Sequence, residues 1–347
     1  GLSPMHMACA CGHMSVCQWL FEVGAAGDIT KTNNDGLTPM HMACDGGHLS
    51  VCQWLFEVGA AGDITKTDDD GFTPMHMACN CDHLSVCQWL FKVGAAGDIT
   101  KANNEGFTPM QLACDGHLSV CQWLFEVGAA GDITKANNRG FTPMHKACEG
   151  GHLSVCQWLF EVGAAGDITK ANNGGYTPMH MACEGGHLSV CQWLFEVGAA
   201  GDITKANNGG YTPMHRACDG GHLSVCQWLV LNSVLNDHTS EQVDEAIVKG
   251  AVCWMNGDTQ SKLLSWARDM IDTHDTFLNV FLRASVILPA SQQHAHPSAC
   301  CLLPRLHRAV LERVSWFAGV EVGRRVRNVR EFKEALDQEE SDDCDDY

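Results

Sequence analysis

Residues 36–70 read GLTPMHMACDGGHLSVCQWLFEVGAAGDITKTDDD, and the chain carries seven near-identical copies of this stretch. The copies are spaced 35 residues apart, except for one step of 34 residues between Gly106 and Gly140. One such unit cannot bury its own apolar face, whereas stacked neighbours bury it together. The sequence therefore predicts a repeat array rather than one compact globule. The copies open at Gly1, Gly36, Gly71, Gly106, Gly140, Gly175 and Gly210.

The first half of each unit predicts a short helix. Thr38 is a residue type that caps helix N-termini, and Pro39 suits the first helical position because no backbone hydrogen bond is lost there. The pair Gly46-Gly47 is expected to end this helix. Its apolar stripe consists of Met40, Ala43 and Cys44.

The second half predicts another helix, which starts at His48 and ends near Gly59. Residues 60–71 are rich in Gly, Asp, Asn and Thr, so we expect an extended finger with Ile64 as its apolar anchor. The apolar residues at helical spacing are Val51, Cys52, Trp54, Leu55 and Val58.

The order Gly-x-Thr-Pro-x-His-x-Ala, then Gly-His-x-x-Val, then Gly-Ala, resembles the ankyrin repeat over residues 1–231. The resemblance implies an all-α ankyrin-repeat solenoid of stacked helix-turn-helix units with finger loops. It also implies protein binding through the fingers and the concave helix surface.

The units depart from the usual ankyrin pattern in three places. Two extra residues in Gly-Ala-Ala-Gly-Asp are expected to lengthen the base of each finger. The fourth copy has a shorter inter-helix turn and Gln111 in place of His, which still donates and accepts hydrogen bonds. The third copy has Cys81-Asp82 in place of two glycines, and Asp tolerates left-handed geometry.

One Trp per unit is expected to occupy a core position, where truncation to Ala typically costs about 3–5 kcal/mol. These residues are Trp19, Trp54, Trp89, Trp123, Trp158, Trp193 and Trp228.

Fourteen of the 20 cysteines recur in two fixed positions of the unit, one after Ala and one after Val. They lie within apolar helical patterns, so they are interpreted as buried, reduced thiols rather than a disulfide framework. This interpretation predicts a cytoplasmic or nuclear protein.

Positions that differ between the copies are the candidate partner-binding residues. The slot after the opening glycine carries Leu or an aromatic residue, and aromatic residues dominate binding hot spots. The alternative is that these side chains pack against the neighbouring finger. The slot holds Leu2, Leu37, Phe72, Phe107, Phe141, Tyr176 and Tyr211.

A second slot, at the end of the first helix, is mostly acidic and favours a basic partner, unless it is only a solvated helix end. Lys146, Arg216 and Arg139 replace uncharged or acidic residues of other copies and are candidates for tuning specificity. The recurring histidines are expected to be structural. The second slot holds Asp45, Asn80, Asp115, Glu149, Glu184 and Asp219.

Beyond the repeats, residues 232–336 predict a helical cap or small domain, and residues 337–347 predict a disordered acidic tail. Zinc is not expected, because the candidate ligand types match no standard spacing. Nucleic acid is not expected either, because the formal net charge is −19 despite four clustered arginines. The candidates considered are His294, His296, Cys300, Cys301 and His307 for zinc, and Arg324, Arg325, Arg327 and Arg330 for nucleic acid.

These observations predict a non-enzymatic scaffold or adaptor without cofactors, which binds a protein partner as a monomer. The sequence carries no standard catalytic motif and no apolar run of the roughly 18–20 residues that a membrane crossing needs. The alternative is that the array selects a target while the C-terminal segment recruits an effector, such as a ubiquitin-ligase component. The chain begins within the repeat pattern and without Met, so we expect a fragment or an incomplete gene model.

Overall fold

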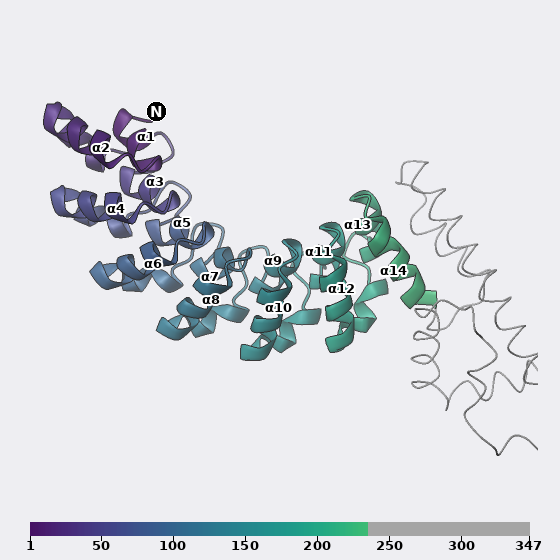
Figure 1. Cartoon of the computed structure of the whole chain (residues 1–347). Coiled ribbons are helices and arrows are strands. Elements are labelled where there is room, and N and C mark those ends of the chain that lie inside the picture. Colours follow the sequence, from purple (N-terminus) through teal and green to yellow (C-terminus); the bar gives the residue numbers. More distant parts are fainter. Residues whose placement is uncertain (235–347) are drawn as a thin grey trace, which may run out of the picture. The chain divides into compact units, whose positions relative to one another are not determined.

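The computed structural model describes residues 1–234, which form seven stacked units of two helices each (Figure 1). No strand occurs within these residues. The first helices are α1 (Pro4–Ala10), α3 (Pro39–Asp45), α5 (Pro74–Asn80), α7 (Pro109–Ala113), α9 (Pro143–Glu149), α11 (Pro178–Glu184) and α13 (Pro213–Asp219). The second helices are α2 (Met14–Leu20), α4 (Leu49–Leu55), α6 (Leu84–Leu90), α8 (Leu118–Leu124), α10 (Leu153–Leu159), α12 (Leu188–Leu194) and α14 (Leu223–Val234).

The all-α repeat fold is confirmed by this arrangement. The predicted C-terminal helices, the acidic tail and the candidate zinc and arginine clusters lie outside the described residues.

Six of the seven first helices begin with a cap in which a histidine takes part. Thr38 has extended backbone angles, and its hydroxyl accepts a hydrogen bond of 3.4 Å from the His41 backbone N–H. The His41 ring returns the contact, because its Nδ1 accepts from the Thr38 backbone N–H at 3.2 Å. The predicted cap at Thr38 is therefore confirmed, and its third helical residue is His rather than the more usual Glu or Gln.

The same histidine ties its unit to the next. With Nδ1 accepting, the proton lies on Nε2, which donates to the Phe72 carbonyl oxygen at 3.2 Å. In the fourth copy Gln111 takes over this role, since its side-chain N–H group donates to the Phe141 carbonyl at 2.8 Å. Gln111 therefore preserves the stack, as the sequence predicts.

A second histidine ties each unit to the one before it. His48 caps α4 and its Nε2 lies 3.0 Å from the Ala10 carbonyl oxygen. The turn ahead of this histidine needs a left-handed residue: Gly47 has φ +71, and a Cβ there would lie 2.4 Å from the ring of His83. In the third copy Asp82 holds φ 61, so the predicted turn is retained.

The segment expected to be an extended finger from residue 60 onward is instead largely helical. A π-helical turn (Phe56–Ala60) follows α4 and is interrupted at Gly59, whose φ of +127 confirms the predicted helix end; a 3-10 turn (Ala61–Thr65) comes next, and extended backbone begins at Lys66. The two extra residues therefore lengthen the helical connection and not the finger base. Burial of Ala60 and Ile64 provides the physical reason, because the turns hold these side chains in the core.

These turns recur in the other units. The π-helical turns are Phe21–Ala25, Phe56–Ala60, Phe91–Ala95, Phe125–Ala129, Phe160–Ala164 and Phe195–Ala199. The 3-10 turns are Ala26–Thr30, Ala61–Thr65, Ala96–Thr100, Ala130–Thr134, Ala165–Thr169 and Ala200–Thr204.

Neighbouring fingers are joined by asparagine side chains. Asn103 Oδ1 accepts from the backbone N–H groups of Glu105 and Phe107 at 3.1 and 2.8 Å, which fixes the finger turn. The next residue, Asn104, donates through Nδ2 to the Asp69 carbonyl of the preceding finger at 2.9 Å. The fingers therefore stack through hydrogen bonds between adjacent loops.

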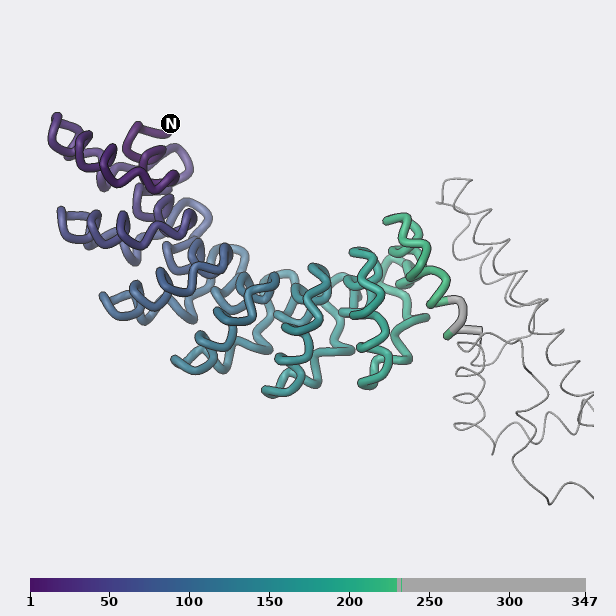
Figure 2. Tube along the Cα trace, viewed as in Figure 1, coloured from purple at the N-terminus to yellow at the C-terminus, as the bar shows by residue number. Residues whose placement is uncertain are grey.

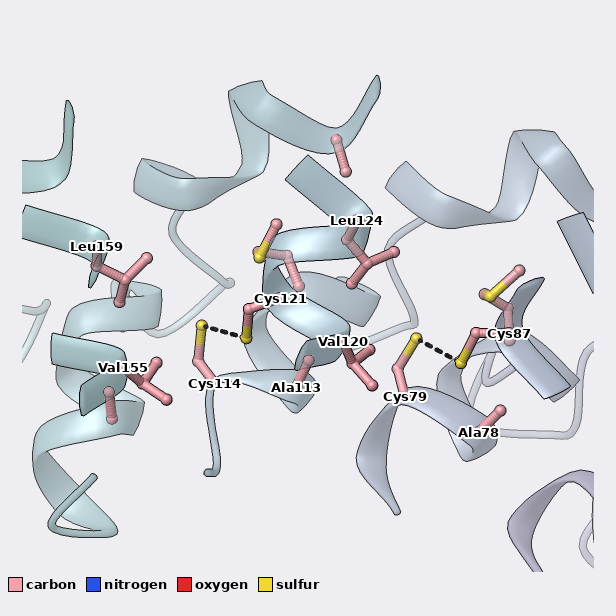
Figure 3. Packing of buried hydrophobic residues seen from close by; sticks show 14 of the residues in the cluster. Ala78, Cys79, Cys87, Ala113, Cys114, Val120, Cys121, Leu124, Val155 and Leu159 are labelled. Atoms are coloured by element: carbon pink, nitrogen blue, oxygen red, sulfur yellow. Dashed lines mark hydrogen bonds between the residues drawn. The ribbon is translucent and has the colours of Figure 1, made fainter. Parts of the chain in front are cut away.

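The core is built from small and flexible side chains, and it contains a pair of sulfurs in every unit. The Sγ atoms of Cys79 and Cys87 lie 3.6 Å apart between the two helices of one unit. The Sγ atoms of Cys114 and Cys121 are the same distance apart in the next unit (Figure 3). All 16 cysteines of the described residues are free, which confirms the interpretation of the repeated cysteines as thiols. Burial raises the pKa of the Cys79 and Cys114 thiols well above the ordinary value.

The described array is curved, with the first helices along its inner edge and the second helices along its outer edge (Figure 2). Consecutive first helices pack more closely than consecutive second helices do. Buried alanines such as Ala43 and Ala78 permit this close approach, because they add little bulk between the helices. The first helices thereby form the inner face.

The tryptophans do not occupy the core positions that the sequence predicts. They are half-buried at the junctions between units, and Trp19 at the end of the array is 58% exposed. The ring of Trp123 packs edge-on against Phe91 of the preceding unit, with centroids 5.9 Å apart. The fully buried positions belong to residues such as Met110 and Leu124, because a flat stack leaves no room for an indole ring.

We expect Trp123→Ala to lower the free energy of unfolding by about 2 kcal/mol, below the range for a fully buried Trp, because only part of the ring is buried. Urea unfolding followed by circular dichroism measures the change. Trp19→Ala is the matched control and should cost less than about 1 kcal/mol, since its ring is largely exposed. Equal losses in both variants would contradict a role at the junction.

Stability should fall as the pH drops from 6.5 toward 4. Burial lowers the pKa of four cap histidines to about 4 from an ordinary value of 6.5, so protonation favours the unfolded chain in this window. Each should contribute about 2 kcal/mol of stability at pH 8 that is lost by pH 5. The residues are His41, His76, His145 and His180.

The fourth copy supplies the control for this pH effect. Replacing the four histidines with Gln, as at Gln111, keeps the bridging donors and removes the titration. Urea midpoints of the Gln variant should then depend on pH much less than those of the parent chain. A variant whose midpoints fall as steeply would show that other groups cause the loss.

Iodoacetamide at pH 8 should modify Cys11 rapidly and leave the paired thiols unmodified in the native chain. Cys11 is exposed, whereas the paired cysteines are buried, and burial raises the pKa of one thiol in pairs such as that of Cys44 well above the ordinary value. Peptide mass spectrometry after quenching reports each cysteine separately, with the chain unfolded in urea as the fully labelled reference. Rapid native labelling of Cys114 would contradict the closed core.

Candidate functional site

Three positions of each first helix lie along the inner face and differ between the copies. The first, the finger column, directly precedes the capping Thr. The second, the middle column, is the fourth helical residue, which a hydrophobic staple pairs with the residue before the cap. The third, the acid column, lies three residues further on, on the same side of the helix.

The finger column holds Leu2, Leu37, Phe72, Phe107, Phe141, Tyr176 and Tyr211. The middle column holds Met7, Met42, Met77, Leu112, Lys146, Met181 and Arg216. The acid column holds Asp45, Asn80, Asp115, Glu149, Glu184 and Asp219.

Arg216 shows how the three columns meet. Its guanidinium carbon lies 4.6 Å from the ring centroid of Tyr176 and 5.7 Å from that of Tyr211. The guanidinium also donates to the Tyr176 hydroxyl, and its Nη1 lies 3.8 Å from a carboxylate oxygen of Glu184. The middle column is therefore in contact with the finger column on one side and with the acid column on the other.

Lys146 makes the corresponding contacts with the acid column only. Its Nζ lies 3.6 Å from a carboxylate oxygen of Asp115 in the preceding unit and 3.3 Å from one of Glu149 in its own. Asp115 is also 3.5 Å from Nε2 of His152. The acid column thus links neighbouring units wherever the middle column carries a cation.

The rings of the finger column are half-buried rather than freely exposed. Phe72 packs edge-on against His76 with centroids 5.7 Å apart, and Tyr176 packs in the same way against His180. Tyr211 is 41% exposed. Four of the five rings, those of Phe72, Phe141, Tyr176 and Tyr211, therefore shield the cap histidine of their own unit and leave one edge or face at the surface.

The acid column is exposed apart from Asp115, which is half-buried. The fingertips add a further charged position, which changes sign along the array: Asp35, Asp70 and Glu105 are followed by Arg139, and the last two fingers carry glycine. Arg139 Nη2 lies 3.5 Å from a carboxylate oxygen of Glu105. Neighbouring fingertips of opposite charge are thus within reach of each other.

Sequence reasoning missed two features of this region. It placed Lys146 and Arg216 where other copies carry Met or Leu, but it did not predict their contacts with the finger and acid columns. It also overlooked five buried aspartates, each in an ion pair with the Lys three residues on, such as Asp63 with Lys66 at 3.8 Å. Burial raises the pKa of these carboxyls: Asp63, Asp98, Asp132, Asp167 and Asp202.

Histidine and cysteine are the chemically reactive residue types that recur in this part of the chain, and their side chains make structural contacts. The repeated histidines bridge backbone carbonyls, and the repeated cysteines lie in the core. Within residues 1–234 there is no group of three or more His, Cys, Asp or Glu side chains placed to hold a metal ion. The helices of the same residues include none that is both long and apolar enough to cross a membrane.

A family profile described as "Ankyrin repeats (3 copies)" matches residues 1–68, 58–135, 96–172, 127–205 and 166–240. Together these matches span residues 1–240, well over half of the 347-residue chain. The chain therefore belongs to the ankyrin-repeat family, whose members generally mediate protein–protein interactions and are typically not enzymes. No curated protein matches the chain.

Proposed function

We propose that this chain is a non-enzymatic scaffold or adaptor that binds a protein partner through its fingers and inner face. The observation that carries the proposal is where the copies differ. All three columns and the fingertips vary, whereas the first seven residues of the second helices are identical except for Met14 in the first copy. Packing fixes the outer frame, and the inner face is free to vary with the partner.

The finger column is the part of the inner face that we expect to contribute most to binding. Its rings are rigid and partly buried, and four of the five pack against a cap histidine, so little conformational entropy is lost when a partner covers their exposed parts. In the same proposal the chain acts as a monomer in the cytoplasm or nucleus, without a cofactor, membrane or nucleic acid.

Replacing the aromatic rings of the finger column with Leu should abolish capture of the partner while leaving the fold intact. Leu37 occupies this position in the second copy, so the substitution is compatible with the unit. The variant carries Phe72→Leu, Phe107→Leu, Phe141→Leu, Tyr176→Leu and Tyr211→Leu. Chemical cross-linking in a cell lysate, followed by affinity capture and mass spectrometry, compares it with the parent chain.

The control variant changes the outer face instead, with four exposed second-helix glutamines replaced by Ala: Gln53, Gln122, Gln157 and Gln192. A protein captured by the parent and control chains, and lost with the Leu variant, would support binding through the inner face. Retention by the folded Leu variant would assign the binding to residues beyond 234, in line with effector recruitment by the C-terminal segment.

A further inference from the structure

The contacts of Arg216 define the kind of group that fits between the finger and acid columns. One cation lies against the ring of Tyr176 and near a carboxylate of Glu184. Aromatic faces and carboxylates both attract guanidinium and ammonium groups, and the two attractions act together in this position. The chain therefore contains, in its own seventh unit, an example of a bound cation.

Cations occupy the middle column only in the second half of the array. Lys146 and Arg216 fill it in the fifth and seventh units, where they contact Asp115, Glu149 and Glu184. The first four units carry uncharged, flexible side chains in the same place: Met7, Met42, Met77 and Leu112. By its place in the columns Met77 corresponds to Arg216, with Phe72 in the place of Tyr211, Asp45 in the place of Glu184 and Leu37 in the place of Tyr176.

The first half is also the more acidic part of the array. Residues 1–105 carry 12 acidic and four basic residues, whereas residues 140–234 carry seven and four. The carboxylates of Asp35, Asp45, Asp69 and Asp70 form no ion pair with any residue from 1 to 234. An incoming cation would therefore meet unneutralised carboxylates there.

We infer that the inner face of units 1–4 binds an amphipathic, Arg- or Lys-rich segment of the partner protein, and that Lys146 and Arg216 exclude such a segment from units 5–7. The partner's apolar side chains lie on the methionines of the middle column, which adapt to different shapes. Its cations lie between the finger column and the carboxylates. This inference rests on the proposed function and specifies the chemistry of the partner.

The probe is a fluorescein-labelled amphipathic helical peptide of Leu and Arg, with a Leu and Glu peptide of equal length as its counterpart. Fluorescence anisotropy with the full chain should detect binding of the Arg peptide, weakening as salt is added, and no binding of the Glu peptide. Met77→Arg, which adds a guanidinium at the position equivalent to Arg216, with Asp45 in the place of Glu184 and Phe72 in the place of Tyr211, should weaken binding of the Arg peptide by roughly tenfold.

Gln53→Arg is the matched control for Met77→Arg, because it adds the same charge at an exposed position of the outer face. It should change the affinity less than about twofold. This control measures how far added positive charge alone alters the attraction of the peptide to the whole chain, including the acidic tail. The reverse variant, Arg216→Met, frees Tyr176, Tyr211 and Glu184 and should strengthen binding by roughly threefold. Lys92→Met, which removes a positive charge from an exposed position in the turn after α6, serves as its control.

Equal effects of Met77→Arg and Gln53→Arg would overturn the inference, as would an unchanged affinity in Arg216→Met. Circular dichroism and urea midpoints establish that each variant is folded. If the Arg peptide fails to bind but the Leu variant of the finger column still loses its captured protein, the inner face binds a partner of different chemistry. In that case the inference fails and the proposed function stands.

Discussion

The hydrogen bond from Nε2 of His41 to the carbonyl oxygen of Phe72 is the contact on which the stack depends. It joins two consecutive units, and in the neutral ring it requires the tautomer that carries the proton on Nε2. The cap supplies that condition, because the Thr38 backbone N–H donates to Nδ1. One side chain thus starts a helix, sets its own tautomer and positions the next unit.

The repetition of this contact has consequences for the core. Each unit must lie close and parallel to its neighbour for the histidine to reach, so only small or flexible residues fit between the first helices. Alanine, cysteine and methionine satisfy that requirement and are fully buried, whereas tryptophan is displaced to the junctions, where it meets a phenylalanine edge-on. Sulfur atoms 3.6 Å apart, in units such as that of Cys114 and Cys121, are the product of this packing.

The same constraint explains why the residues that stack the units are shared by the copies, whereas the residues of the inner face vary. The second helices, the turns and the cap contacts are shared by all units, so nearly all of their residues are fixed by packing. The inner face is not fixed in this way, and the differences between units gather there. Arg216 and Lys146 show that a single changed residue in the middle column alters what a unit presents, from an apolar surface beside a carboxylate to an internally neutralised pair.

Much of the fold was determined by the sequence itself. The period, the caps at Thr-Pro, the left-handed turn at Asp82 and the equivalence of Gln111 to His all depend on local backbone geometry or hydrogen-bonding capacity, which individual residues carry with them. The candidate residues of the finger and acid columns were also visible as differences between copies. The contacts between these columns, and the chemistry of those contacts, were not visible in the sequence.

Tertiary structure decided the remaining features, because those features depend on distances between units and no single unit specifies these distances. The tryptophans were expected in the core, and stacking placed them at the junctions. Residues 61–65 were expected in the finger, and the burial of Ile64 drew them into a helical turn. Arg216 was one charged residue among several until the stack set it against Tyr176 and Glu184, since those side chains come from the preceding unit.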